Sequence, residues 1–256
     1  MRHKSITIVL VGIILIFPLL CSSSSTEKEI ESHNIVLRYS TIIPDNIAET
    51  FLENQEARLR FVQMLLNIRI DKKIDIYLLG TLSLSAAWAD IQESAIEYMI
   101  PIGSLLRPNF QGIHNMGSCH HELVHVVTGL GWPGYWSDAI CEGLAVYVDF
   151  AWPSLCKKDI YLVTHQLIRD NELLSLKDLL AQSITPETSE RQMENIYFAS
   201  ATLIDFIIET YSLSQLEQFY RISGFPYVLL EQRIIEIFGV TFTNLEREWL
   251  SYVNSK

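Results

Sequence analysis

The sequence predicts an α+β fold, with a small mixed αβ lobe over about residues 34–130 and an all-helical lobe over about residues 131–256. Two observations predict this division. The first half holds short β-like runs and one long amphipathic stretch, whereas the second half places apolar residues at helical spacing almost to its end. A chain of 256 residues can build one sizeable core or two packed lobes. The cleft between the lobes is the expected place for a functional site.

Strands are predicted in the first lobe where short apolar runs lie between turn residues. These runs are Asn34–Tyr39, Ile74–Leu79 and Ala95–Ile102. Pro44 and Asp45 open a long helix, because the residues that follow are apolar at helical spacing. Ser83–Ala89 is predicted to form a short helix.

Helices are predicted for nearly all of the chain beyond Gly117. The first covers His120–Leu130, and the second covers Asp138–Phe150 with Ser137 or Asp138 as its cap. Further helices are expected at about 154–171, 175–182, 190–211, 213–222, 226–238 and 242–253.

The first of these helices contains the sequence His-Glu-Leu-Val-His at positions 121–125. Residues four apart lie on the same face of a helix, so His121 and His125 can hold one metal ion while Glu122 acts on water beside it. Glu142 lies among apolar residues of the second helix, where a carboxylate needs a partner. We therefore predict one Zn²⁺ per chain, with His121, His125 and Glu142 as ligands. Glu122 is predicted to take the proton of the attacking water and deliver it to the leaving amine.

These motifs resemble those of the gluzincin metallopeptidases, and most closely the peptidase MA-like domains related to aminopeptidase N and thermolysin. The second motif of that family reads roughly Asn-Glu-Gly-Phe/Leu-Ala-x-Tyr, and this chain has Glu-Gly-Leu-Ala-Val-Tyr from Glu142 onward. The resemblance implies that residues 34–256 form a single zincin-like catalytic domain that hydrolyses peptide bonds. It also implies that Tyr197 steadies the oxyanion through its hydroxyl, although Ser200 replaces a glycine of the family pattern. A tyrosine of the core is the alternative for Tyr197.

The resemblance leaves two modes of cleavage open. The sequence contains no Gly-x-Met-Glu-Asn stretch of the kind that holds a substrate's free amine in aminopeptidase N relatives. Endopeptidase and aminopeptidase activity therefore both stand as expectations. The resemblance further implies that Ala95–Ile102 is an edge strand that pairs with extended substrate. The alternative function is a surface-tethered, non-catalytic zinc-containing protein of the same fold that binds or assembles partners.

Other residues near the motif have two interpretations each. Asp149 could orient a ligand imidazole or be an ordinary solvated acid. His120 points about 100° away from His121 on a helix, so it is not counted as a ligand. The aromatic loop with Trp132, Tyr135 and Trp136 could line the cleft or cap the metal helices.

The start of the chain predicts export. The first 21 residues read as a signal peptide, with basic Arg2 and Lys4, an apolar run over Ile6–Leu20, and Cys21 as in a lipoprotein signal. Residues 22–33 are predicted to be a tether. The protein is thus expected at the cell surface as a lipoprotein, or secreted, in a bacterium, with membrane contact only through this N-terminal anchor.

Cysteine content and charge restrict the partners. Cys119, Cys141 and Cys156 could supply one disulfide, with a Cys119–Cys141 bridge between the metal helices, or could be buried thiols. The net charge of −11 and the lack of a Lys/Arg-rich stretch disfavour nucleic acid. A peptide or protein substrate is the expected partner.

Overall fold

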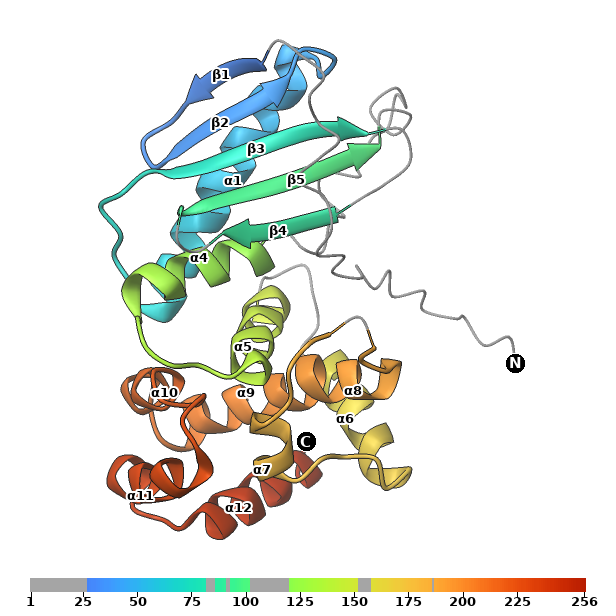
Figure 1. Cartoon of the computed structure of the whole chain (residues 1–256), viewed down its shortest axis with the longest axis vertical. Coiled ribbons are helices and arrows are strands. Elements are labelled where there is room, and N and C mark those ends of the chain that lie inside the picture. Colours follow the sequence, from blue (N-terminus) through green and yellow to red (C-terminus); the bar gives the residue numbers. More distant parts are fainter. Residues whose placement is uncertain (1–26, 82–85, 91–92, 102–119, 152–157, 186) are drawn as a thin grey trace.

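The computed structural model describes residues 27–81, 86–90, 93–101, 120–151, 158–185 and 187–256. A lobe built on a β-sheet and a helical lobe are stacked along the long axis of the molecule, and helices α4 (His121–Gly131) and α5 (Asp138–Ala151) lie where they meet (Figure 1). This is the α+β arrangement that the sequence predicts.

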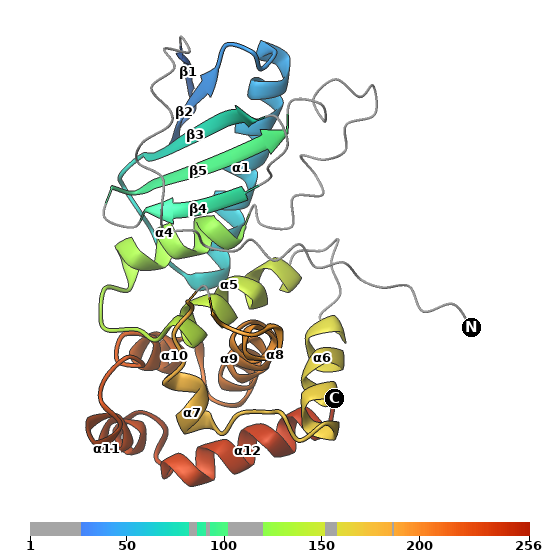
Figure 2. The same cartoon turned by 45° about the vertical axis from the view of Figure 1, so that its right-hand side comes forward.

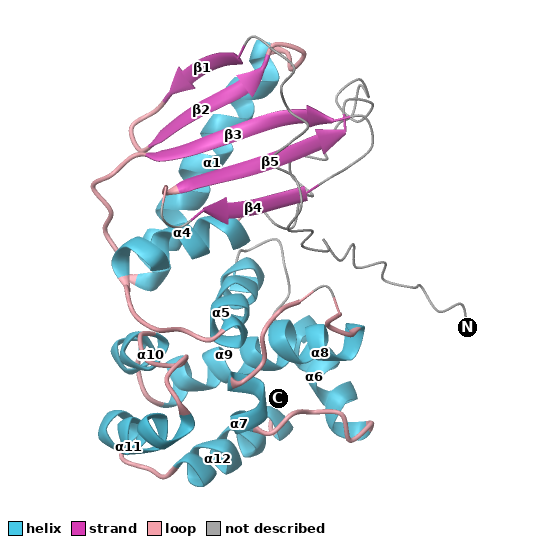
Figure 3. Cartoon of the chain, viewed as in Figure 1, coloured by secondary structure: helices cyan, strands magenta, loops and turns pink. Residues whose placement is uncertain are grey.

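The sheet has five strands in the order β1-β2-β3-β5-β4 (Figure 3). Their bounds are Glu27–Glu31 for β1, Ile35–Ser40 for β2, Ile74–Thr81 for β3, Ala86–Asp90 for β4 and Ala95–Pro101 for β5. The three inner strands are parallel, and each outer strand is antiparallel to its neighbour.

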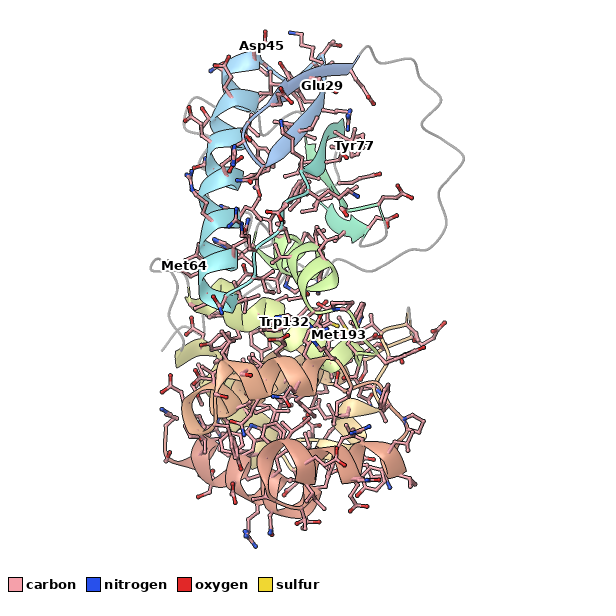
Figure 4. The ribbon with its side chains drawn as sticks, turned by 90° about the vertical axis from the view of Figure 1, so that its left-hand side faces the viewer. Glu29, Asp45, Met64, Tyr77, Trp132 and Met193 are labelled. Carbon is pink, nitrogen blue, oxygen red and sulfur yellow. The ribbon has the colours of Figure 1, made fainter. Side chains whose placement is uncertain are left out.

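Helix α1 (Asp45–Leu66) covers one face of the sheet. The core of this lobe lies between the helix and that face. Alternate residues of the inner strands, such as Leu37, Ile76 and Ile96, are fully buried. Phe51 of α1 packs edge-on against Tyr98 of β5, with ring centroids 5.3 Å apart. Figure 4 shows α1 along one side of the sheet and Tyr77 on the other.

Three expectations for this lobe are wrong. The described part of the predicted helix Ser83–Ala89 belongs to β4, which pairs with β5. A short run of apolar residues suits a strand as well as a helix, and here the neighbouring strand decides. The predicted edge strand Ala95–Ile102 is β5, which lies between β3 and β4, so the edge of the sheet is β4. Within the predicted tether 22–33, Glu27–Glu31 forms the other edge strand, β1.

The helical lobe follows the sequence prediction. Its helices are α6 (Lys158–Arg169), α7 (Leu176–Leu180), α8 (Glu190–Glu194), α9 (Ser200–Thr210), α10 (Leu213–Tyr220), α11 (Tyr227–Phe238) and α12 (Phe242–Asn254). A π-helical turn, η1 (Asn195–Ala199), joins α8 to α9. Figure 2 shows α5 between α4 and this continuous α8–η1–α9 segment, and α5 contacts all of α4, η1 and α9.

The described residues include no helix that combines the length and the apolar character needed to span a membrane.

Candidate metal centre

Helix α4 presents two imidazoles to the junction of the lobes. His121 and His125 are one turn apart, and their ring centroids are 4.8 Å apart. The opposite side of α4 is anchored by apolar residues, since Leu123, Val126 and Val127 are fully buried. The amphipathic pattern of α4 therefore turns the two histidines away from the core of the sheet lobe and toward α5.

Helix α5 brings Glu142 to the same place. Ser137 directly precedes the helix, and its hydroxyl accepts a hydrogen bond from the backbone N–H of Ile140 at 3.3 Å, as predicted for a cap. Gly143 follows Glu142, and a Cβ added there would lie 2.4 Å from the Cβ of Ser200 on α9. The close approach of α5 to α9 thus requires glycine next to the candidate ligand.

The three predicted ligands converge on one point. His121 Nε2 lies 2.7 Å from Glu142 Oε2, and His125 Nε2 lies 3.7 Å from Glu142 Oε1. One ligand atom from each of the three residues lies within 4.8 Å of the others. Two donors on one tetrahedral zinc ion are separated by about 3–4 Å. The donor set of two nitrogens and one carboxylate oxygen, and its spacing, therefore fit Zn²⁺.

The electrostatics of the site favour a cation. Burial raises the pKa of Glu122, and the charges of Glu142 and Asp149 raise it further against the pull of the two histidines. Burial lowers the pKa of His121, but Glu142, Glu122 and Asp149 outweigh it and raise that pKa to about 9. For Glu142, burial is outweighed by His125 and His121, which hold its pKa well below the usual range. The buried carboxylates of Glu122 and Asp149 and the half-buried carboxylate of Glu142 lie around two imidazoles, and a dication would compensate their negative charge.

Asp149 lies behind the histidines. Its carboxylate is buried and reaches within 3.3 Å of His120 Nδ1 and within 3.9 Å of His121 Nδ1. Asp149 therefore lies close to the imidazole of His121, as one of its two interpretations requires, but its nearer partner is His120. His120 itself is buried against Phe61, with centroids 5.9 Å apart, and lies outside the group of three converging side chains.

Tyr197 lies beside the candidate ligand His121, on a turn that no local sequence pattern predicts. Its ring stacks on His121, with centroids 5.7 Å apart and an interplanar angle of 23°. Burial raises the pKa of Tyr197, and the charge of Glu142 and a hydrogen bond to Glu142 raise it further. The residue belongs to η1, and single π-helical turns are frequent at functional sites. Its hydroxyl therefore stays protonated and can act as a donor beside the candidate ligands.

The aromatic loop before α5 packs mainly on α10. Trp132 is buried against Tyr220 of α10, with centroids 5.5 Å apart, and Trp136 lies 5.9 Å from the same ring. Tyr135 is exposed beside Phe225. Of the two interpretations offered for this loop, the hydrophobic cap fits these contacts.

Cys141 is a free, buried thiol, so the predicted Cys119–Cys141 bridge is wrong. Its Sγ lies 3.3 Å from the hydroxyl of Tyr220. Burial raises the pKa of this thiol, as expected for a small apolar core residue. Cys119 and Cys156, like Cys21, lie outside the described residues.

Sequence reasoning missed a link between the two metal helices. The Tyr220 hydroxyl lies 2.9 Å from Thr128 Oγ1 on α4 as well as 3.3 Å from Cys141 Sγ on α5. Tyr220 is one of eleven tyrosines and is 92 residues from Thr128, and no local pattern connects them.

Comparisons with known proteins show a likeness of fold. No protein-family model and no curated protein matches this chain. A crystal structure of an aminopeptidase N family protein from Idiomarina loihiensis superposes with a TM-score of 0.52 and 12% identity, over 88% of this chain and 46% of that one. Native yeast LTA4 hydrolase superposes with a TM-score of 0.53 and 13% identity, over 86% of this chain and 38% of that one.

The chain thus spans less than half the length of these two proteins. At this level of identity the likeness concerns the fold alone. The predicted α+β fold, a small sheet lobe followed by helices, is therefore confirmed, and it is similar to part of an aminopeptidase N family protein and of LTA4 hydrolase.

Proposed function

We propose that this chain is a zinc-dependent metallopeptidase that hydrolyses peptide bonds. One observation carries the proposal: His121, His125 and Glu142 bring ligand atoms within 4.8 Å of one another, directly beside the buried carboxyl group of Glu122. A complete metal-binding set with a base next to it suits hydrolysis. The fold likeness to an aminopeptidase N family protein supports the same reaction class.

Each residue has a distinct role in this proposal. His121, His125 and Glu142 would hold the zinc ion, which when bound acidifies water and polarises a carbonyl oxygen. Glu122 would accept a proton from water and pass it to the leaving amine, a role that suits a buried carboxyl group with a raised pKa. Tyr197 would donate its hydroxyl hydrogen to the oxygen on which negative charge develops.

The proposal includes the setting of the enzyme. The substrate would be a peptide or protein, because the site lies at the junction of two lobes and the acidic chain disfavours nucleic acid. Export, with Cys21 as a lipid anchor or with cleavage among the serines that follow, is supported by the basic start and the apolar run over Ile6–Leu20.

The test combines metal analysis with a single substitution. Purified protein should contain one zinc per chain and should cleave members of a mixed peptide library. Glu122→Gln should keep the metal and lower kcat by about 10²–10⁴-fold, because it removes the proton acceptor and leaves the ligands in place. Glu53→Gln, on the exposed side of α1, is the matched control and should leave both quantities unchanged.

Two results would contradict the proposal. Full activity in Glu122→Gln would exclude Glu122 as the base. Stoichiometric zinc without turnover on the library would favour the alternative, a surface-tethered binding or assembly protein that keeps its metal for structure.

A further inference from the structure

A cavity of about 360 Å³ opens in the helical lobe beside the first turn of α5. Its walls come from the residues before α5, from α7 and the segment after it, and from the starts of α11 and α12. Its lining is mixed: polar groups such as Asp138 and Gln182 lie beside large apolar or aromatic side chains, which are Trp136, Leu180, Phe225, Tyr227, Leu230 and Phe242.

The cavity adjoins the candidate metal centre along α5. Asp138 lines the cavity, and Glu142 lies one helical turn further on, on the same side of the helix and about 6 Å along its axis. The carboxylate of Asp138 is also close enough to Tyr197 to add to the rise in the pKa of that tyrosine. Asp138 therefore lines the cavity and lies one helical turn from the candidate ligand Glu142.

A hydrogen bond fixes one wall of the cavity. Asp138 Oδ2 accepts the backbone N–H of Ile184 at 2.9 Å, which holds the segment after α7 against the start of α5. Gln182 and Ser183 of this segment line the cavity. This wall of the cavity is thus a stretch of chain that is anchored to the start of α5.

The chemistry of the walls selects large apolar groups. Tyr227 and Phe242 pack edge-on at 5.2 Å, and they form an aromatic wall. Lys177 Nζ lies 4.3 Å from the centroid of the Tyr227 ring, and its side chain is exposed, so its charge stays at the surface. A charged group would lose its hydration on entering between the aromatic walls, whereas an aromatic or branched aliphatic group would gain from leaving water.

We propose that this cavity is a specificity pocket that receives one large apolar side chain of the peptide substrate, aromatic for preference. The inference rests on the proposed peptidase function and adds to it the class of substrate. The volume allows a side chain as the occupant, because 360 Å³ leaves room for one aromatic group and lies near the lower end of the range of about 300–1,000 Å³ for small-molecule sites. The proximity of Asp138 to Glu142 supports an occupant that also reaches the metal centre.

The test uses the full chain and peptides that differ at one residue. In each peptide, Gly, Leu, Phe or Lys occupies one of the two positions that flank the cleaved bond, and the rest of the peptide is unchanged. At one position, Phe should exceed Gly in kcat/KM by about tenfold or more, mainly through KM, and Lys should be disfavoured. Ala181→Trp places a bulky group at the cavity wall and should abolish this preference while kcat on the Gly peptide is kept.

Leu229→Trp is the matched control. It introduces the same side chain at an exposed position of α11, next to the cavity and outside its lining, and should leave the preference unchanged. Phe225→Ala enlarges the cavity and should shift the preference from Phe toward Trp. This second variant keeps the test decisive if Ala181→Trp does not fold.

Binding measured without turnover separates the pocket from the peptidase proposal. Calorimetry on Glu122→Gln should show tighter binding of the Phe peptide than of the Gly peptide, and Ala181→Trp in that background should remove the difference. This result without any hydrolysis by the wild type would uphold the pocket and overturn the peptidase assignment. Hydrolysis with the same Phe preference in Ala181→Trp and Leu229→Trp would overturn the pocket and uphold the peptidase.

Discussion

The side chain of Tyr197 is held at both ends, and this makes its two contributions separable. The ring stacks on His121 at 5.7 Å, while the hydroxyl is hydrogen-bonded to Glu142. Packing depends on the ring, whereas donation to a developing oxyanion depends on the hydroxyl. A substitution that removes only the oxygen can therefore distinguish a catalytic tyrosine from a core tyrosine.

We predict that Tyr197→Phe retains zinc and KM within about twofold and lowers kcat by about 10²–10³-fold, the usual loss for one oxyanion donor. Steady-state kinetics together with metal analysis measure this. Tyr211→Phe is the control, because it removes a hydroxyl that bonds Glu248 at 2.8 Å, away from the candidate site. A kcat of Tyr197→Phe within twofold of wild type would show that Tyr197 is a core aromatic residue without a catalytic role.

The placement of site residues could be predicted where the pattern is local. The spacing of His121, Glu122 and His125 on one helical turn determines where each side chain points, so their placement could be predicted from helix geometry alone. Glu142 could be placed from its apolar surroundings and from the resemblance. The contact of Tyr197 with His121 depends on a π-helical turn, and the pairing of Asp149 with His120 depends on how α4 crosses α5; neither is encoded in a local period.

At the scale of elements, α10 links α4 and α5 through one side chain, that of Tyr220. The Tyr220 hydroxyl lies within hydrogen-bond distance of Thr128 on α4 and near Cys141 on α5, and Cys141 directly precedes Glu142. Tyr220 is fully enclosed, with Trp132 and Trp136 packed on its ring. This contact sets the spacing of the helices that carry the candidate ligands, so it should influence metal affinity without touching the metal.

We predict that Tyr220→Phe weakens zinc binding by about 10–100-fold, as loss of outer supporting groups does in metal sites. The free energy of unfolding of metal-free protein should fall by about 0.5–1.5 kcal/mol, because one buried hydrogen bond is lost. Competition with a zinc-chelating dye and urea unfolding in chelator measure the two effects. Tyr161→Phe, which removes a hydroxyl bonded to Asp205 between α6 and α9, should lower stability alone. Equal zinc affinity in both variants would contradict this role for Tyr220.

The elements themselves could be predicted to different degrees. Long periodic helices such as α1 and α12 were predicted within a few residues, because their apolar faces repeat over several turns. The short strand β4 was predicted to be a helix, and β5 was expected at the edge. Both errors concern pairing between segments, which is set by the sheet as a whole and leaves no period in a run of five to seven residues.

At the scale of the whole molecule, the sheet lobe is closed at its outer edge by one buried carboxylate. Glu56 of α1 accepts hydrogen bonds from Ser32 Oγ at 2.5 Å, from the backbone N–H of Asn34 at 2.7 Å and from Asn34 Nδ2 at 3.1 Å. These groups lie in the turn between β1 and β2, so Glu56 fastens the first hairpin of the sheet to the helix that covers it. The hairpin in turn borders β3, whose neighbours lead to the junction with α4.

The hydrogen bonds accepted by Glu56 predict how the stability of the protein depends on pH. Burial raises the pKa of Glu56, but the hydrogen bonds from Ser32 and Asn34 outweigh it, so the folded-state pKa lies below the usual value of 4.5. The contribution of Glu56 to stability is therefore complete above pH 4.5 and is lost as pH falls through the lower, folded-state pKa. Glu56→Gln keeps the shape of the side chain and removes the charge that accepts these bonds.

We predict that Glu56→Gln lowers the free energy of unfolding at pH 7 by about 1.5–3 kcal/mol, the usual contribution of hydrogen bonds to a charged group. The difference from wild type should shrink below pH 4.5, because the wild-type carboxylate then becomes protonated too. Urea unfolding in chelator at pH 7 and at successively lower pH measures it, and the comparison cancels the titration of the metal site, which both proteins share. A difference in the free energy of unfolding that stays constant down to pH 3 would show that Glu56 acts through the shape of its side chain. The charge of its carboxylate would then make no contribution to the stability of the sheet lobe.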